Sequence, residues 1–218
     1  MDLDGTPVGP GDPNRAAWNS IFADVPESWY TAPPSRAQVE CTDYLKSGGT
    51  RSVLDLGCGM GRWSVHFARA GLVVSGIDYA SNAVELARRW ADAEGLDIRF
   101  ACRAVTEEAF PGETFDAAVA ALVLDNIARE EMRDAIGRMR AALRPGGLAF
   151  CLFNPIAVCA DDDADNPTTG LTRVVYRDAE LVEAFSGFEV LDRRVYEAGT
   201  RGIYLRAGVG PTAGAVPR

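Results

Sequence analysis

The residues of this chain that most clearly point to ligand binding are an acid and three alternating glycines. Asp55 is followed by Gly57, Gly59 and Gly61, so an acid stands two positions before a G-x-G-x-G run. Alternate glycines let the backbone adopt positive φ and approach a ligand closely. The dinucleotide fingerprint is instead G-x-G-x-x-G, and a carboxylate suits a nearby diphosphate poorly. The pattern therefore favours a ligand that carries an ammonium or sulfonium group.

A second acid, Asp78, ends the apolar run Val73–Ile77 and follows Asp55 by 23 residues. One strand over from the glycine turn, a carboxylate in this position can accept hydrogen bonds from both hydroxyls of a ribose. The simpler alternative is that Asp78 caps the helix expected to begin near Ser81. We favour the ribose interpretation.

These two motifs resemble those of the class I S-adenosylmethionine-dependent methyltransferases. The resemblance covers residues 50–153 well, and it includes Phe115-Asp116 at the start of a strand and the turn Arg144-Pro145-Gly146-Gly147. It implies an α/β fold, a Rossmann-like, doubly wound, seven-stranded sheet that is mostly parallel with one antiparallel strand and has helices on both faces. It also implies S-adenosyl-L-methionine as the cofactor, with Asp78 on its ribose.

The cofactor-binding residues that the resemblance implies lie in the glycine turn, in the helix after it and at three later strand ends. They are Asp55, Gly57, Cys58, Gly59, Arg62, Trp63, Asp78, Tyr79, Ala104, Val105 and Leu122. After the third strand many relatives have Gly-Asp-Ala, whereas this chain has Arg103-Ala104-Val105. Because no side chain there can accept a hydrogen bond from the adenine amino group, backbone groups near Ala104 and Val105 must hold the base, or the adenine contact is weaker.

Polar residues after the fourth and fifth strands are the candidates for meeting a substrate. Asp125 and Asn126 stand at the edge where open α/β sheets bind ligands. An Asp-Asn pair before a helix is equally typical of a cap. A hydroxyl acceptor would need a base, for which Asp125 and Tyr30 are the candidates. Asn154 is a further candidate for substrate binding.

Large apolar side chains crowd the segment before the first motif, namely Trp18, Ile21, Phe22, Trp29 and Tyr30. They fit either a short amphipathic helix over the edge of the sheet or a lid over the cofactor. We hypothesise that Trp29 or Tyr30 contacts the methionine end of the cofactor, where cation–π attraction is worth about 0.5–2 kcal/mol. Both are also candidate substrate contacts.

Hydrophobic runs and turn residues predict the elements that position these side chains. We expect strands at 51–56, 73–78, 98–102, 113–121, 148–153, 188–196 and 201–207, and helices after Ser35 and at 63–70, 81–94, 130–143 and 178–185. Residues 154–172 form an unusually long connector. The domain prediction is a flexible tail and aromatic lid at 1–34, one methyltransferase domain at 35–207 and a loose tail at 208–218.

Composition limits the partners and the compartment. The formal net charge of −9 disfavours nucleic acid, because domains that bind it usually have a basic surface. Five scattered cysteines without C-x-x-C spacing, together with a single histidine, predict no metal site and reduced thiols in the cytoplasm. The longest uncharged apolar run, Ala117–Leu124, is too short to span a membrane.

We therefore predict methyl transfer to a small-molecule acceptor, at an oxygen, nitrogen or sulfur nucleophile, by direct in-line displacement. Alignment in such a reaction is worth about 7–11 kcal/mol, which explains why no acid–base constellation is evident. Two alternatives stay open. One is a non-methylating displacement with the same cofactor, such as aminocarboxypropyl transfer or cyclisation, and the other is a non-catalytic nucleotide-binding module. The acceptor and the oligomeric state are open as well.

Overall fold

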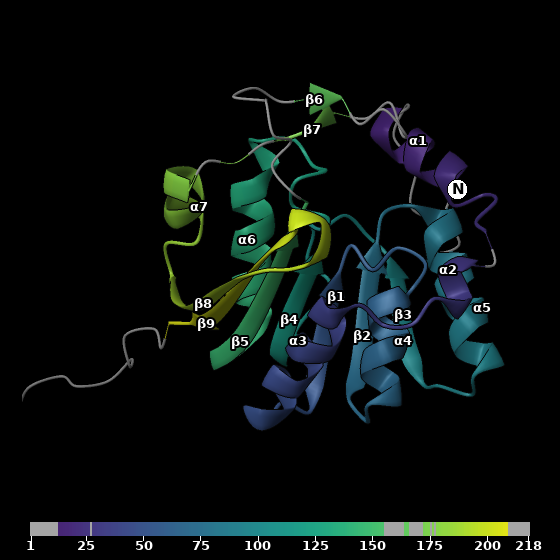
Figure 1. Cartoon of the computed structure of the whole chain (residues 1–218), viewed down its shortest axis with the longest axis horizontal. Coiled ribbons are helices and arrows are strands. Elements are labelled where there is room, and N and C mark those ends of the chain that lie inside the picture. Colours follow the sequence, from purple (N-terminus) through teal and green to yellow (C-terminus); the bar gives the residue numbers. More distant parts are fainter. Residues whose placement is uncertain are drawn as a thin grey trace, which may run out of the picture.

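The computed structural model describes residues 13–26, 28–154, 164–165, 172–174, 176 and 178–208. At its centre is a seven-stranded sheet in the order β3-β2-β1-β4-β5-β9-β8 (Figure 1). The strands are β1 (Ser52–Leu56), β2 (Val73–Asp78), β3 (Ile98–Cys102), β4 (Phe115–Ala121), β5 (Leu143–Phe153), β8 (Phe188–Val195) and β9 (Arg201–Ala207). β1 to β5 pair in parallel, whereas β9 runs antiparallel to both β5 and β8. The predicted fold class, with one antiparallel strand in the sheet, is confirmed.

The helices follow the predicted order and precede or connect these strands. They are α1 (Pro13–Ile21), α2 (Ser28–Thr31), α3 (Arg36–Ser47), α4 (Arg62–Arg69), α5 (Ser81–Ala93), α6 (Glu131–Ala141), α7 (Asp178–Ala184) and the 3-10 helix η1 (Glu197–Gly199). Two short strands, β6 (Ala164–Asp165) and β7 (Thr172–Arg173), pair with each other in the predicted connector, most of which lies outside the described residues. Residues 1–12 and 209–218, to which the predicted tails largely belong, also lie outside them.

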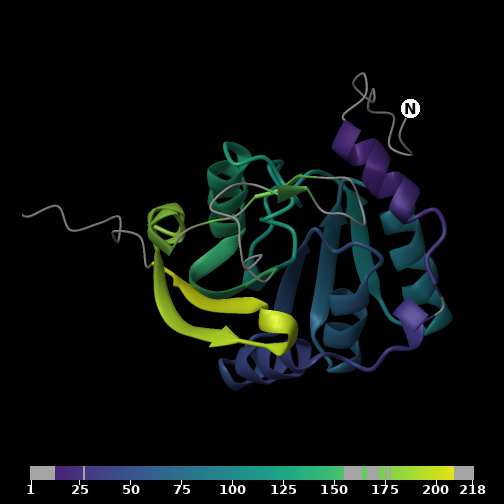
Figure 2. The same ribbon diagram turned by 45° about the horizontal axis from the view of Figure 1, so that its top comes forward.

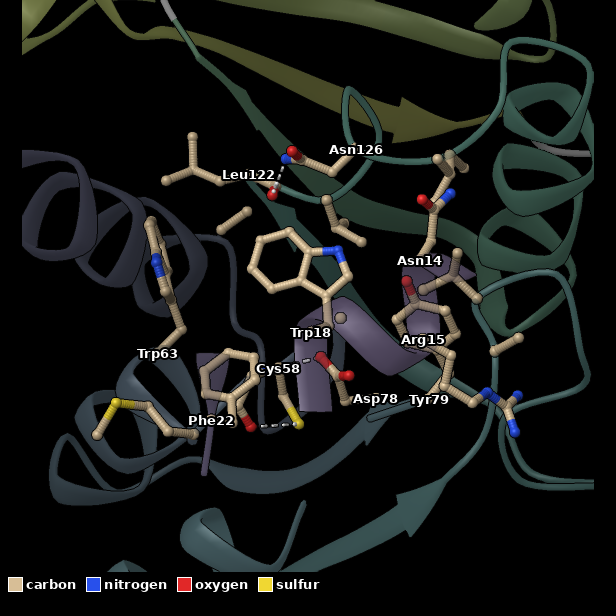
Figure 3. Close-up of a pocket in the computed structure, with 18 of the residues that line it drawn as sticks. Asn14, Arg15, Trp18, Phe22, Cys58, Trp63, Asp78, Tyr79, Leu122 and Asn126 are labelled. Carbon is tan, nitrogen blue, oxygen red and sulfur yellow. Dashed lines mark hydrogen bonds between the residues drawn. The ribbon is translucent and has the colours of Figure 1, made fainter. Parts of the chain in front are cut away.

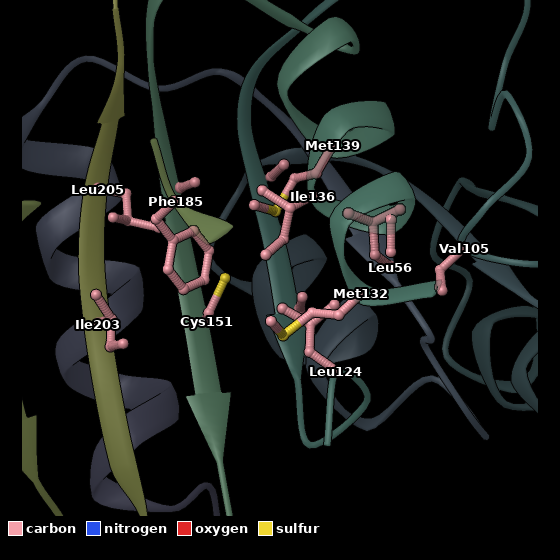
Figure 4. Close-up of a cluster of buried hydrophobic side chains, with 14 of the residues drawn as sticks. Leu56, Val105, Leu124, Met132, Ile136, Met139, Cys151, Phe185, Ile203 and Leu205 are labelled. Carbon is pink, nitrogen blue, oxygen red and sulfur yellow. The ribbon is translucent and has the colours of Figure 1, made fainter. Parts of the chain in front are cut away.

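Helices cover both faces of the sheet (Figures 1 and 2). On one face, Leu45 of α3 and Phe67 of α4 pack in a core cluster with residues of β1, β2, β4 and β5. On the opposite face, Met139 of α6 and Phe185, the residue that follows α7, pack in a second cluster with residues of the same sheet (Figure 4). Because the central strands are covered on both sides, β1 and β4 have buried side chains at nearly every position rather than in alternation.

Local signals set the element boundaries where the sequence is explicit. Ser35 caps α3 as predicted, and it forms a reciprocal capping box with Gln38. The turn at residues 144–147 differs from its prediction, because β5 begins already at Leu143, which pairs with Phe115 before the register shifts. The predicted turn is thus an irregularity inside the strand rather than a loop before it.

The N-terminal segment lies over the carboxyl edge of the sheet. α1 packs beside α5 at this edge (Figures 1 and 2). Its first helical residue is Pro13, a residue that suits the first helical position because its missing N–H is not needed there. Within the described residues, no helix has both the length and the apolar character to cross a membrane.

Candidate active site

A cavity of about 680 Å³ lies between the carboxyl ends of β1, β2 and β4 and the N-terminal segment (Figure 3). This volume is typical of sites for small molecules, which span about 300–1,000 Å³. The residues that line it are Asn14, Arg15, Trp18, Phe22, Trp29, Gly57, Cys58, Gly59, Met60, Arg62, Trp63, Asp78, Tyr79, Ala104, Val105, Thr106, Ala121, Leu122, Val123, Asn126, Ile127 and Glu131. The wall therefore brings together most of the residues that the sequence predicts. Four predicted residues, Tyr30, Asp55, Asp125 and Asn154, are not part of it.

The glycine turn joins β1 to α4 and forms one side of the cavity. Gly57 has a φ of 66°, and a Cβ atom built on it would lie 2.4 Å from Cγ2 of Val123. Gly61 adopts the left-handed conformation at the N-cap of α4. The Cys58 N–H donates to the Ile77 carbonyl at 2.9 Å, which fixes the turn against β2. The turn thus needs glycine both for backbone conformation and for close contact with the β4 end.

Cys58 lies inside this turn and is buried. Burial and the nearby carboxylates of Asp55 and Asp78 raise the pKa of its thiol well above the ordinary value. A thiol in this state is protonated at neutral pH and is a poor nucleophile. Cys58 therefore contributes to the shape of the cavity wall and does not supply a nucleophile.

Asp78 presents a buried carboxylate to the cavity, with 8% of its surface exposed. Its Oδ2 atom accepts from the Gly59 N–H at 2.9 Å, and its Oδ1 atom accepts from the Ala80 N–H at 2.9 Å. Burial raises the pKa of this carboxyl, and the backbone hydrogen bonds oppose that rise. Since a carboxylate offers about four lone-pair positions, acceptor capacity remains for a ligand.

Asp55 lies behind the glycine turn rather than on the cavity wall. It is 1% exposed, and its Oδ2 atom accepts from the Ser64 hydroxyl at 2.6 Å. Burial is the main cause that raises its pKa to about 7. The predicted direct contact with a cationic ligand does not fit this placement, because the carboxylate is shielded by the turn that it supports. The sequence places Asp55 correctly next to the turn but does not reveal which way its side chain points.

The wall opposite the turn follows β3. Ala104, Val105 and Thr106 line the cavity, as the prediction for the first two requires. The Ala104 N–H donates to Oε2 of Glu107 at 3.3 Å, so this backbone donor already has a partner. Thr106, which the sequence analysis does not single out, adds a hydroxyl to the same wall.

The end of β4 forms a strained tip at the cavity. Leu122 has a φ of 60°, which is unusual for a residue with a Cβ and costs roughly 1–3 kcal/mol. The Asn126 side-chain amide donates to the Leu122 carbonyl at 2.8 Å and closes the tip. Both residues line the cavity, so their predicted positions agree with the structure.

Asp125 and Asn154 form a hydrogen-bonded pair and do not line the cavity. Asp125 is 3% exposed, and its Oδ2 atom accepts from the Asn154 backbone N–H at 2.8 Å and from the Asn154 side-chain amide at 2.9 Å. The Asp125 carbonyl accepts from the Val174 N–H at 2.9 Å. These contacts connect the ends of β4 and β5 to the returning connector. They do not fit the predicted roles of a general base and a substrate contact, because both side chains are turned toward each other.

Aromatic residues of the N-terminal segment close the cavity from above the sheet edge. Trp18, Phe22 and Trp29 line it, whereas the Tyr30 ring packs edge-on against Trp90 with centroids 5.0 Å apart. Tyr30 therefore does not fit its predicted place at the reacting centre. Trp18 belongs to α1 and Trp29 to α2, which agrees with a helical segment over the sheet edge, and the lid over the cofactor stays a prediction.

Arg62 lines the cavity, but its guanidinium donates hydrogen bonds to the segment that covers the cavity. Nη1 donates to the Trp29 carbonyl at 2.9 Å, and Nη2 donates to the Pro33 carbonyl at 2.7 Å. The side chain thus fastens the segment around α2 to the start of α4. Because both bonds go to the covering segment, they give no support to the predicted contact of Arg62 with the cofactor.

Comparisons with known proteins identify the family. Residues 53–147 match a family model described as a methyltransferase domain. The chain is 43% identical over 103 residues to a ubiquinone biosynthesis O-methyltransferase of Methylocella silvestris, a match that covers 45% of this chain and 38% of that relative. Residues 53–147 are thus a methyltransferase domain, in agreement with the resemblance to the class I S-adenosylmethionine-dependent methyltransferases.

Other matches extend over more of the chain. A ubiquinone biosynthesis O-methyltransferase of a Bradyrhizobium species is 33% identical over an alignment of 168 residues, and the match covers 68% of this chain and 64% of that protein. The chain thus spans less than two thirds of the length of these relatives.

Solved structures share the fold of this chain at low sequence identity. An S-adenosylmethionine-dependent methyltransferase from Clostridium acetobutylicum has a TM-score of 0.68 at 13% identity, covering 86% of this chain and 94% of its own. Magnesium protoporphyrin IX methyltransferase from Synechocystis, solved with bound cofactor, has a TM-score of 0.68 at 15% identity and covers 92% and 100%.

Several residues of the cavity wall are not among those that the sequence predicts for the site. They are Asn14, Arg15, Met60, Thr106, Ala121, Ile127 and Glu131. For α1 a signal was present, because Asn14, Trp18 and Phe22 stand four residues apart and share one helix face once the helix is taken to begin at Pro13. For Ile127 and Glu131, which follow an irregular stretch, no comparable pattern exists.

Proposed function

We propose that this chain binds S-adenosyl-L-methionine and transfers its methyl group to a small-molecule acceptor by direct in-line displacement. The observation that carries the proposal is the placement of Asp78, a buried carboxylate oriented by two backbone N–H groups on the wall of a cavity in a methyltransferase domain. A carboxylate held in this way can accept both hydroxyls of a ribose.

The remaining wall suits the other parts of this cofactor. Tyr79, Val105 and Thr106 would surround the base. The glycine turn packs closely against Val123, and a Cβ on Gly57 would clash with that side chain. When bound, the cofactor supplies a methyl group on a positively charged sulfur. The rings of Trp29 and Trp63 line the same cavity, and aromatic faces attract such a charge.

Residues at the β4 end would align the acceptor. Leu122, Val123 and Ile127 provide apolar surface, and Asn126 provides an amide on the same wall. Among the described residues, the carboxylates on the wall are Asp78 and the exposed Glu131. An amine or a thiolate acceptor needs no base, so this wall suits such nucleophiles or an already ionised hydroxyl better than a neutral alcohol. The O-methyltransferase names of the relatives favour an oxygen acceptor.

We also infer that the acceptor is a small molecule rather than a nucleic acid, and that the chain works in a reducing compartment such as the cytoplasm. The net charge of −9 supports the first inference. The free thiols of Cys41, Cys58, Cys102 and Cys151 support the second.

A product assay tests the proposal. The purified chain is incubated with S-adenosylmethionine and a panel of phenols, amines and thiols, and the nucleoside products are identified by mass spectrometry. We expect S-adenosylhomocysteine in the presence of an acceptor. Methylthioadenosine would indicate the non-methylating displacement. Calorimetry that detects binding of NAD but not of S-adenosylmethionine or S-adenosylhomocysteine would overturn the assignment altogether.

A further inference from the structure

α1 makes its contacts on the half of the cavity that holds Asp78. The ring of Phe22 lies 3.3 Å from the position that a Cβ on Gly59 would occupy, beside the N–H that binds Asp78. The guanidinium of Arg15 stands 5.4 Å from the ring centroid of Tyr79, the residue after Asp78. Trp18, which stacks on Phe22 with centroids 5.9 Å apart, projects into the cavity between these points (Figure 3).

The third contact of α1 is made by Asn19 with the start of α5. Its Oδ1 atom accepts from the Asn82 N–H at 3.0 Å and from the Ser81 hydroxyl at 3.2 Å. Its backbone carbonyl accepts from the Asn82 side-chain amide at 2.8 Å. One residue of α1 thus makes three hydrogen bonds to the first turn of α5.

α5 needs this partner because it has no side-chain cap of its own. The residue at its N-cap is Ala80, which cannot accept a hydrogen bond through its side chain. The Asn82 N–H occupies the N2 position, one of the donors that an N-cap side chain normally satisfies. Asn19 therefore caps α5 from a position more than sixty residues earlier in the chain.

The capped turn is continuous with the ribose carboxylate. Ala80 donates its N–H to Asp78 Oδ1, and the next two residues are Ser81 and Asn82. The same short segment thus fixes Asp78 on one side and receives α1 on the other. Undocking α1 would uncover the wall at Asp78 and would leave the first turn of α5 without its cap.

We propose that Asn19 is a positioning residue that couples the docking of α1 to retention of the cofactor. α1 must leave α5 before the adenosyl half of the ligand can depart, and the bonds of Asn19 set how often it does so. This inference rests on the proposed function, since it takes the ligand at Asp78 to be the adenosyl group of the cofactor.

The test measures the dissociation rate of S-adenosylhomocysteine by surface plasmon resonance on the full chain. Loss of an N-cap is worth about 0.5–2 kcal/mol, so we expect Asn19→Ala to raise this rate by roughly two- to thirtyfold. Asn19→Asp, whose carboxylate also caps a helix, is expected to dissociate at close to the wild-type rate. Ser20→Ala is the matched control on the exposed side of the same helix and is expected to leave the rate unchanged. The KM for the acceptor, at saturating cofactor, is expected to be unchanged in all three variants.

Two results would overturn the inference, and they differ in meaning. If Asn19→Ala lowers the Tm but dissociates at the rate of Ser20→Ala, Asn19 only stabilises the fold. If the wild-type chain does not bind S-adenosylhomocysteine, the proposed function fails, and this inference fails with it.

Discussion

At the scale of single residues, Asp78 shows how a buried charge is prepared for a ligand. Its two backbone hydrogen bonds fix both oxygens before any ligand arrives, so little ordering is left to binding. Asp55 is also a buried aspartate, but its carboxylate accepts a hydrogen bond from the Ser64 hydroxyl. Two acids of similar appearance in the sequence therefore have different tasks, one at the wall and one behind it.

Replacement of Asp78 tests the ribose contact. Asp78→Asn removes a charged acceptor, and hydrogen bonds to charged groups are worth about 1.5–3 kcal/mol, so we expect the Kd for S-adenosylhomocysteine to rise about tenfold to 150-fold. Calorimetry measures this, with exposed Asp92→Asn on α5 as the charge-matched control. Equal affinity of both variants would remove Asp78 from the ribose site.

Gly57 offers a separate test of the turn. Gly57→Ala places a methyl group 2.4 Å from Val123 at a φ of 66°. Gly95 has a φ of 64° with open space around its Cβ position, so Gly95→Ala measures the conformational penalty alone, about 1–2 kcal/mol. We expect Gly57→Ala to lower the free energy of unfolding by more than Gly95→Ala and to weaken cofactor binding, as measured by denaturation and calorimetry. Equal losses in both variants would mean that the contact with Val123 is not tight.

At the scale of elements, the ends of β4 and β5 are joined by the pair of Asp125 and Asn154. This contact also holds the strained tip at Leu122 in place indirectly, because Asp125 and Leu122 belong to the same irregular stretch after β4. α3 and α4 are joined in a similar way, since the Gln38 side chain donates to the Arg62 carbonyl at 3.1 Å. In both places a buried polar side chain at an element end connects to a backbone group of a neighbouring element.

The Asp125 pair gives a prediction that separates structure from catalysis. Asp125→Ala leaves two partly buried donors of Asn154 without their acceptor, each costing less than the penalty of about 1–3 kcal/mol for a fully buried donor, so we expect a lower Tm. Asp125→Asn keeps one carbonyl oxygen and is expected to retain kcat at a temperature below its Tm. A general base would instead lose about 10²–10⁴ in kcat in both variants. Tm and kcat measured together decide between the two roles.

At the scale of the whole molecule, the buried carboxyls make stability depend on pH. The pKa of Asp55 is about 7 in the fold, above its value near 4 in an unfolded chain. Between these values the folded state binds more protons than the unfolded state, so this group lowers stability as the pH rises from about 4 to about 7. Above pH 7 its unfavourable contribution is complete.

Asp55→Asn is therefore expected to become more stable than the wild type as the pH rises. The difference in the free energy of unfolding should be small near pH 4, grow through pH 7 and level off at no more than about 4 kcal/mol. Urea denaturation at several pH values measures it, with exposed Asp97→Asn as the control. A difference that stays constant with pH would mean that folding does not raise the pKa of Asp55.

The sequence by itself determined the strand–turn–helix around Gly57, the acid at the end of the next strand and the order of the main strands and helices along the chain. These features follow from residues close together in the chain, where hydrophobic runs, glycines and caps act locally. Only the tertiary structure decided that Asp125 turns to Asn154, that Tyr30 turns to Trp90 and that Asn19 caps α5. Each of these contacts joins residues far apart in the chain, and the choice of partner for a polar or aromatic side chain depends on which elements the packed core brings together.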